Sequence, residues 1–363
     1  MRGLYIHIPF CKKICSYCDF PKLVSNEKNY KIYIDAIKKE IDSKKEDLVN
    51  IDTVYIGGGT PNVLPDELLI DLLKHIHPYI MNAKEVTIEA NPELITIAQA
   101  DIFYEYGINR VSLGVESTSD SSLKLLGRGH KIEDVTKAIA ILRDKHIQNI
   151  NLDFIFGYPM ETLDNLKSDL EYVYKENVPH CSFYSLILED KTIFSYLLSK
   201  GELKLLDDDL IADMYDYINK DLYNHGYKHY EISNYAKDGY ESIHNELYWK
   251  EMEYVGIGMG ASGFIKPYRY TNYKTLKKYL ECIEEERILI PLEEEKKEFM
   301  MLGLRMLEGI SLSYYESKYH SSPIIDFDLS KHIDSGLLKI EGDRLFIPED
   351  KLFIANIVYE EFV

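Results

Sequence analysis

The sequence predicts an α/β protein, with a partial (β/α)6 barrel of the TIM type followed by a small, mainly helical C-terminal domain with a winged-helix-like hairpin. Two observations support this prediction. The first two-thirds of the 363 residues alternates short β-branched runs with amphipathic helical stretches, the pattern of parallel βα units. The polar motifs of the chain come after the predicted strands, and barrels carry their chemistry at the carboxyl ends of strands. A barrel is therefore favoured over an open sheet.

The alternating elements of the barrel can be placed in order along the chain. Predicted strands span residues 4–8, 53–56, 85–89, 110–113, 150–154 and 182–186. Predicted helices between them span residues 30–44, 66–78, 95–106, 132–145 and 163–176. The order strand, helix, strand predicts that all six strands run parallel.

The rest of the chain is predicted to form a connecting segment and a terminal domain. We place the boundaries at residues 1–235, 236–289 and 290–363. Residues 203–285 are predicted to contain a helix, a tyrosine-rich loop region and a glycine-rich segment. The terminal domain is predicted to have a helix at 293–307, two shorter helices, a hairpin at 337–340 and 344–347, and a final helix.

Charge argues against binding to nucleic acid. The formal net charge is −19, and residues 292–363 hold 8 Lys/Arg against 15 Asp/Glu, a net of −7. This sign opposes phosphate contacts, so the winged-helix-like unit is interpreted as a cover or interaction domain and not as a DNA reader. The charge also opposes wholesale adsorption to an anionic membrane, although peripheral membrane contact and a homodimer stay open.

The cysteine count and the hydropathy favour a reducing, cytoplasmic location. Five cysteines are an odd number without disulfide-like spacing. Cys181 and Cys282, which lie far from the other three, are predicted to be buried thiols. No apolar stretch approaches the roughly 20 residues of a membrane-spanning helix.

Three cysteines within eight residues, Cys11, Cys15 and Cys18, are the most informative feature of the chain. Three thiolates can bind three irons of a [4Fe–4S] cluster and leave the fourth iron open for a small molecule. The alternative is a structural zinc site whose fourth ligand is a distant Cys or His. Zinc sites usually use a second, well-separated cysteine pair, and this chain has none, so the cluster is favoured.

A glycine-rich turn, Gly57-Gly58-Gly59-Thr60-Pro61, directly follows the second predicted strand. Glycines allow backbone groups to approach a ligand closely. Together, this turn and the C-x₃-C-x₂-C loop resemble the radical S-adenosylmethionine (SAM) enzymes. The resemblance implies that SAM chelates the open iron and that the backbone around Gly58, Gly59 and Thr60 binds its amino end. It also implies that Tyr17 stacks near the adenine, although simple loop packing remains the alternative.

Further segments resemble the oxygen-independent coproporphyrinogen III oxidase family. They include residues 5–11, 89–92, 109–114, 128–130, 153–159, 184–192 and 230–235. By this resemblance, Tyr5, Glu89, Arg128 and Asp153 contact SAM, where carboxylates accept ribose hydroxyls and Arg pairs with the methionyl carboxylate. The chain has Glu116 where the family usually has Gln, and a carboxylate cannot donate as an amide does.

Within this family two groups differ at identifiable positions. The coproporphyrinogen dehydrogenases carry a fourth Cys two residues after the third, where this chain has Phe20. The HemW-type haem chaperones lack that Cys and carry the pattern His-Asn-x-x-Tyr-Trp, which residues 244–249 match in full. If this segment is helical, His244 and Tyr248 share one face as candidate haem-iron ligands, and Trp249 is placed to stack on the macrocycle. A buried structural role is the alternative for each of them.

The sequence therefore predicts a haem chaperone that binds a [4Fe–4S] cluster, SAM and haem, and that transfers haem to an acceptor protein. The alternative is an oxygen-independent coproporphyrinogen III dehydrogenase, which decarboxylates its substrate to protoporphyrinogen IX. A third hypothesis is a cluster-and-SAM protein with an unrelated substrate. The segment Gly258-Met259-Gly260-Ala261-Ser262-Gly263 spells GxGxxG, but Pro267 interrupts the next ten residues, so it is predicted to be a loop near the active site and not a dinucleotide site.

Overall fold

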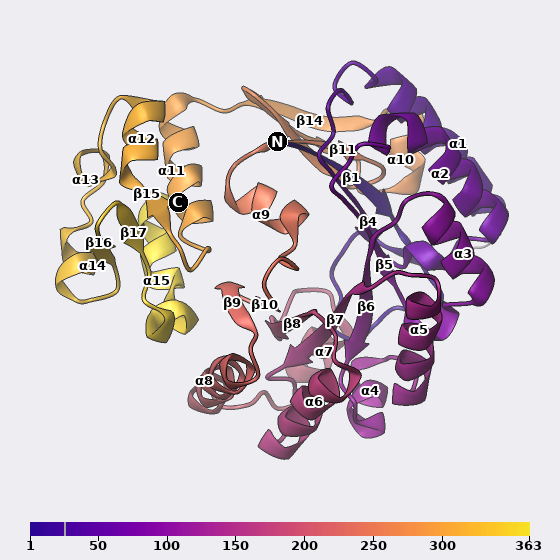
Figure 1. Ribbon diagram of the computed structural model, residues 1–363, viewed down its shortest axis with the longest axis horizontal. Coiled ribbons are helices and arrows are strands. Elements are labelled where there is room, and N and C mark those ends of the chain that lie inside the picture. The colour runs from indigo at the N-terminus through magenta and orange to yellow at the C-terminus, as the bar shows by residue number, and fades with distance from the viewer. Residues whose placement is uncertain (25–26) are drawn as a thin grey trace.

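The computed structural model describes residues 1–24 and 27–363 and contains a 12-stranded sheet with helices along its outer side (Figure 1). The six predicted strands are confirmed, and they pair in parallel in chain order. They are β1 (Arg2–Ile8), β4 (Thr53–Gly58), β5 (Glu85–Ala90), β6 (Arg110–Glu116), β7 (Asn149–Phe156) and β8 (His180–Ser185).

Each strand is apolar on its outer face, because the helices pack there. In β1, for example, Leu4, Ile6 and Ile8 are fully buried, while Tyr5 and His7 between them lie on the inner face. The helix α1 buries Tyr33, Ile34 and other apolar residues at helical spacing. The covering helices are α1 (Glu27–Ser43), α2 (Asp66–Ile80), α3 (Ile97–Glu105), α4 (Asp120–Leu126), α5 (Ile132–Asp144), α6 (Leu163–Glu176) and α8 (Asp208–Asn224).

The sheet extends beyond the predicted strands at both edges. The strand β11 (Glu253–Ile257) pairs in parallel with β1 and continues through an antiparallel meander of β12 (Ser262–Ile265), β13 (Tyr268–Asn272) and β14 (Glu284–Leu289). At the other edge lie β10 (Asn234–Ala236) and β9 (Lys228–Glu231). The predicted loop region between residues 203 and 285 is therefore wrong in part. The strands in this region are short, and the outermost of them, β14, is an exposed, charged strand at the edge of the sheet.

The glycine-rich segment forms the turn between β11 and β12. The amide of Gly258 donates to Glu40 at 2.8 Å, and the amide of Met259 donates to the Tyr33 hydroxyl at 2.8 Å. A strand and not a helix follows, so this segment has no dinucleotide-binding geometry. A side chain at Gly260 would lie 2.8 Å from Pro21, so the turn packs against the segment that follows the cysteine loop.

The C-terminal unit lies beside the barrel as a separate group of helices with a small sheet (Figure 1). The predicted hairpin is confirmed, and β15 adds a third strand to it. The final helix is broken into short pieces. The elements are α11 (Leu292–Gly303), β15 (Ile310–Ser311), α12 (Leu312–Tyr319), α13 (Pro323–Asp326), α14 (Ser330–Asp334), β16 (Lys339–Glu341), β17 (Arg344–Phe346), η3 (Glu349–Ile354), α15 (Asn356–Tyr359) and η4 (Glu360–Phe362).

The helix α9 (Ile243–Trp249) lies between the barrel and this C-terminal unit (Figure 1). The Arg305 guanidinium lies 4.4 Å from the centre of the Trp249 ring, a cation–π contact across the junction. Glu251, just after α9, pairs with Lys318 of α12 and with Lys266 at 3.4 Å. These contacts hold α9 against the C-terminal unit.

The predicted burial of the two cysteines outside the cysteine loop is confirmed for one and wrong for the other. Cys181 is buried as predicted, but Cys282 is exposed, because it ends the short helix α10 (Leu276–Glu281) at the edge of the sheet.

Within residues 1–24 and 27–363, no helix is long and apolar enough to cross a membrane.

Candidate functional site

The three cysteines lie in the loop that follows β1, at the carboxyl end of the parallel strands. Cys11 ends the two-residue strand β2 (Phe10–Cys11), which pairs with β3 (Leu23–Val24) and closes the loop. Cys11 is buried, whereas Cys15 and Cys18 are partly exposed. Burial raises the pKa of the Cys11 and Cys18 thiols, and the nearby Cys18 and Cys15 raise the pKa of Cys11 further. The three thiols are therefore near enough to one another to interact electrostatically.

The three thiols are not grouped as the ligands of a single metal ion are. In the part of the chain that the structure describes, no group of three or more His, Cys, Asp or Glu side chains is close enough to hold one ion. Cluster ligands bind different irons, so they stand further apart than the ligands of one ion. The Arg128 guanidinium donates to the Cys15 sulfur at 3.7 Å.

The glycine turn packs tightly between the cysteine loop and β5. A Cβ at Gly59 would lie 3.0 Å from the Cys11 sulfur and 2.8 Å from the Phe10 carbonyl oxygen, so a larger residue does not fit. The Gly58 amide donates to Glu89 at 2.9 Å. The Thr60 hydroxyl hydrogen-bonds to the Cys11 thiol and lowers its pKa against the larger effect of burial. The turn thus links the thiols to the first of the predicted SAM carboxylates.

Three carboxylates lie on the neighbouring strands β5, β6 and β7, on the inner face. Glu89 also accepts from the Tyr55 hydroxyl at 2.8 Å, and burial raises its pKa to about 7. Asp153 accepts from the Ser112 hydroxyl at 2.6 Å and the Asn151 amide at 2.7 Å. Glu116 lies 3.7 Å from Arg128, and burial raises its pKa against the opposing effect of that guanidinium. These oxygens form an acidic wall of the kind that can accept hydroxyl donors.

The remaining predicted SAM residues join this wall. Arg128 donates to the Asn91 side-chain oxygen at 2.9 Å and the Gly114 carbonyl at 2.8 Å, while its buried Nε has no partner among residues 1–24 and 27–363. Tyr17 hydrogen-bonds to Glu116, and burial raises the Tyr17 pKa well above its usual value. Tyr5 hydrogen-bonds to His7 at 2.8 Å, and its ring centre lies 6.3 Å from that of Tyr55. The structure therefore brings together all nine predicted SAM residues and the three cysteines.

The predicted haem residues lie at the other end of the strands. The Glu85 carboxylate, at the start of β5, accepts from the amides of Ile243 at 2.9 Å and His244 at 3.1 Å, and so binds the amino end of α9. A Cβ at Gly3 of β1 would lie 3.1 Å from the His244 ring. The helix α9 therefore closes the barrel at the amino ends of its strands, and we call this end the barrel floor.

His244 is fully buried in the barrel floor, with 0% of its surface exposed. Its Nδ1 hydrogen-bonds to the Thr53 hydroxyl at 2.8 Å and its Nε2 to the Tyr248 hydroxyl at 2.8 Å. The helical i, i+4 arrangement of His244 and Tyr248 is as predicted, but the two side chains bind each other. Trp249 packs beneath Arg305, and its indole nitrogen is buried without a partner in the described chain. In this arrangement neither His244 nitrogen is free to ligate iron.

Tyr55 connects the two sites. Its hydroxyl donates to Glu89, and its ring centre lies 5.4 Å from that of His244. A buried chain of hydrogen bonds runs beside it from Asp153 through Asn151, His180 and Tyr230 to the amide of Ser242, which caps α9. The alternation of polar residues in β4 to β8 is the sequence signal for these residues, which motif matching did not identify.

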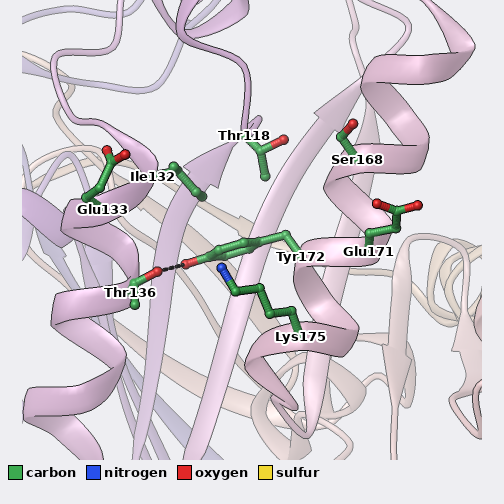
Figure 2. A pocket seen from close by; sticks show the side chains of 8 residues that line it. All are labelled: Thr118, Ile132, Glu133, Thr136, Ser168, Glu171, Tyr172 and Lys175. Carbon is green, nitrogen blue, oxygen red and sulfur yellow. Dashed lines mark hydrogen bonds between the residues drawn. The ribbon is translucent and has the colours of Figure 1, made fainter.

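A hollow on the outer surface of the barrel carries no comparable chemistry. A hollow of about 620 Å³ opens on the outer surface between α5 and α6, as Figure 2 shows. Tyr172 crosses it and hydrogen-bonds to Thr136 at 2.9 Å. None of the cysteines and none of the predicted SAM or haem residues lines it.

Comparison with known families identifies the class of protein. Residues 5–173 match the family model described as Radical SAM superfamily, and residues 290–350 match the HemN C-terminal domain. The solved structure of the coproporphyrinogen III oxidase HemN from Escherichia coli superposes with a TM-score of 0.86 over 99% of this chain and 89% of that chain. At 21% identity this likeness shows the fold alone. The chain is a radical SAM protein, a class whose cofactors are a [4Fe–4S] cluster and SAM.

The chain belongs to the HemW family within that class. It is 35% identical to the protein named heme chaperone HemW from Lactococcus lactis, over 100% of this chain and 97% of that protein. It is 34% identical to the HemW of Bacillus subtilis, over 100% and 99%, and 33% identical to that of Escherichia coli, over 99% and 98%.

The burial of His244 predicts a specific pH dependence of stability. Burial, with a further contribution from Arg110, lowers the pKa of His244 to about 3. The unfolded chain binds a proton below about pH 6.5 that the folded chain does not, so stability falls as the pH drops. Between pH 7 and pH 5, we expect the free energy of unfolding of wild type to fall about 1–2 kcal/mol more than that of His244→Gln.

Urea unfolding of both proteins at the two pH values measures this difference in slope. His75→Gln, which removes a histidine that pairs with Asp42 on the surface, is the matched control. Equal slopes for wild type and His244→Gln would show that His244 is not held neutral in the barrel floor.

Proposed function

We propose that this protein is a haem chaperone, which binds haem and transfers it to an acceptor protein. The observation that carries the proposal is the full-length similarity, at 33–35% identity, to proteins named heme chaperone HemW. Two features of the chain support it. Phe20, 62% exposed in the cysteine loop, has no thiol to offer at the position that distinguishes the dehydrogenases, and α9 carries the complete His-Asn-x-x-Tyr-Trp pattern.

The cluster in this proposal is bound by Cys11, Cys15 and Cys18. The SAM amino group is bound at the turn around Gly58, Gly59 and Thr60, whose backbone faces the thiols. When bound, SAM and the cluster supply redox chemistry, and the chain supplies orientation and exclusion of water. Glu89, Glu116 and Asp153 accept the hydroxyl donors of SAM. Arg128, whose Nε has no hydrogen-bond partner among the described residues, pairs with its carboxylate. Tyr5 and Tyr17 flank this pocket.

Haem binding at α9 requires a rearrangement in this proposal. His244 ligates iron only after its hydrogen bonds to Thr53 and Tyr248 break, because both ring nitrogens are engaged. Haem is also far larger than any space around a fully buried side chain, so α9 must move away from the barrel floor. The junction contacts of Trp249 and Arg305 would open in the same movement. Trp249 would then be free to stack on the macrocycle.

The location and partners are inferred from the same observations. We infer a cytoplasmic protein, since the cysteines described are free thiols and a cluster survives best in a reducing compartment. The partners are haem and an acceptor protein. A homodimer and peripheral membrane contact stay predictions from the sequence.

Cys15→Ala tests the cluster ligands. Anaerobically reconstituted wild type should contain about four iron and four sulfide per chain, and the variant should lose most of both because one iron lacks its thiolate. The exposed Cys282→Ala is the control and should match wild type. Full iron and sulfide content in Cys15→Ala would exclude Cys15 as a ligand.

Haem titration, followed by Soret absorbance, tests the function and distinguishes its two candidate iron ligands. Wild type should bind one haem per chain saturably, and His244→Ala should lose this binding, while His75→Ala keeps it. Tyr248→Phe frees the Nε2 of His244, so binding should be kept or strengthened if His244 is the ligand.

The other outcomes are equally informative. Loss of binding in Tyr248→Phe alone would make Tyr248 the ligand. No saturable binding to wild type would refute the chaperone proposal, and formation of protoporphyrinogen IX from coproporphyrinogen III would then identify a dehydrogenase.

A further inference from the structure

The barrel floor contains a buried cation that forms no ion pair with any of the described residues. Arg110, the first residue of β6, is 1% exposed. Across residues 1–24 and 27–363 its guanidinium has no hydrogen bond or ion pair, and its Nε is fully buried without a partner. Arg128, the other deeply placed arginine of the barrel, makes several such contacts. A buried charge without a partner destabilises the folded protein, so the presence of Arg110 at this position needs a functional reason.

The groups around Arg110 are neutral. Its charge acts on His180, His244, Tyr55 and Tyr230, and it lowers the pKa of both histidines beyond the effect of burial. The ring nitrogens of His180 are engaged with Asn151 at 2.6 Å and Tyr230 at 2.8 Å. None of these side chains can supply a negative charge at neutral pH.

Two carboxylates on the strands beside β6 are used elsewhere. Glu85 accepts from the Thr87 hydroxyl at 3.2 Å and from the amino end of α9. Asp153 accepts from Ser112 and Asn151. Neither forms an ion pair with Arg110. The guanidinium is thus a donor without a partner among the described residues, on the strand next to the one whose Glu85 binds the amino end of α9.

We propose that Arg110 anchors a carboxylate-binding site in the barrel floor, and that the carboxylate it takes is a propionate of haem. The planar guanidinium can bind a carboxylate with two parallel hydrogen bonds, which a lysine cannot do. The site opens when α9 leaves the barrel floor. This inference rests on the proposed function and adds the group that orients the ligand.

The placement suits haem. The two propionates lie at one edge of the macrocycle, apart from the iron. A haem therefore needs a cation near the axial ligand but not in contact with it. Arg110 and His244 have this relation, since Arg110 pairs with Thr87, two residues along β5 from the Glu85 that accepts from the His244 amide, and neither ring nitrogen of His244 bonds to Arg110. Iron ligation by His244 and propionate binding by Arg110 would together fix the plane and the rotation of the macrocycle.

The test compares haem with haem dimethyl ester, whose propionates carry no charge, on the full-length reconstituted protein. Wild type should bind haem about ten- to hundred-fold more tightly than the ester, the effect of one or two charge-assisted hydrogen bonds. Arg110→Met should bind both ligands equally, with the affinity that wild type has for the ester. Arg110→Lys should regain part of the preference.

Matched measurements separate the possible failures. Arg143→Met, which removes a guanidinium bonded to the Glu176 and Asn177 carbonyls on the outside of the barrel, should keep the wild-type preference. The ester comparison in wild type needs no mutant, so it stands even if Arg110→Met does not fold. Equal binding of haem and ester by wild type, or an unchanged preference in folded Arg110→Met, would overturn the Arg110 assignment while leaving the chaperone proposal intact. Failure of both ligands to bind wild type would overturn both proposals.

Discussion

Alternate residues of six parallel strands point into the barrel, and most of these inward residues are polar but shielded from water. Most of these buried polar groups find a partner inside, because leaving one unpaired costs about 1–3 kcal/mol or more, and Arg110 stands out because it has none among the described residues. This constraint determines the interior. Glu89 pairs with Tyr55 and Gly58, Asp153 pairs with Ser112 and Asn151, and His180 pairs with Asn151 and Tyr230. The outer faces need only apolar contact, and the helices provide it.

The same constraint explains why α9 closes the barrel floor. The first amides of a helix have no partner within the helix, and the buried Glu85 carboxylate at the start of β5 needs donors. The two amides at the amino end of α9 therefore donate to this carboxylate. His244 follows as a neutral ring between Thr53 and Tyr248. The His-Asn-x-x-Tyr-Trp motif, which the family resemblance associates with haem, therefore has a structural role here, because it closes the barrel floor. The structural role and haem binding are compatible if α9 exchanges its contacts with the barrel for contacts with haem. Because Trp249 of α9 contacts Arg305, the same movement would change the contact between α9 and the C-terminal unit.

Local sequence patterns were sufficient to predict the six strands and the helices between them, whereas the resemblance to a known family indicated most of the residues gathered at the cysteine loop. The C-x₃-C-x₂-C spacing and the GGGTP turn constrain chemistry over a few residues, so the sequence shows them directly. The strand β11 was missed because it pairs with β1, about 250 residues earlier in the chain, and β14 because its Glu-Glu-Glu-Arg run lacks an apolar face. The roles of Glu85 and Arg110 depend on neighbours brought together by the fold. The expected burial of Cys282 was wrong because residue type does not reveal its position at a sheet edge.

Haem binding at His244 requires α9 to leave the barrel floor, and the proposed roles of His244 and Arg110 both depend on this movement. Hydrogen–deuterium exchange of residues 242–249, with and without one equivalent of haem, would detect it. In the haem-free protein the Ile243 and His244 amides are bonded to Glu85, so they should exchange slowly. We expect haem to increase deuterium uptake in this segment, while strands β5 and β6 change little. Stoichiometric haem binding with unchanged or reduced uptake across residues 242–249 would contradict the proposed movement, because haem would then bind without opening the barrel floor.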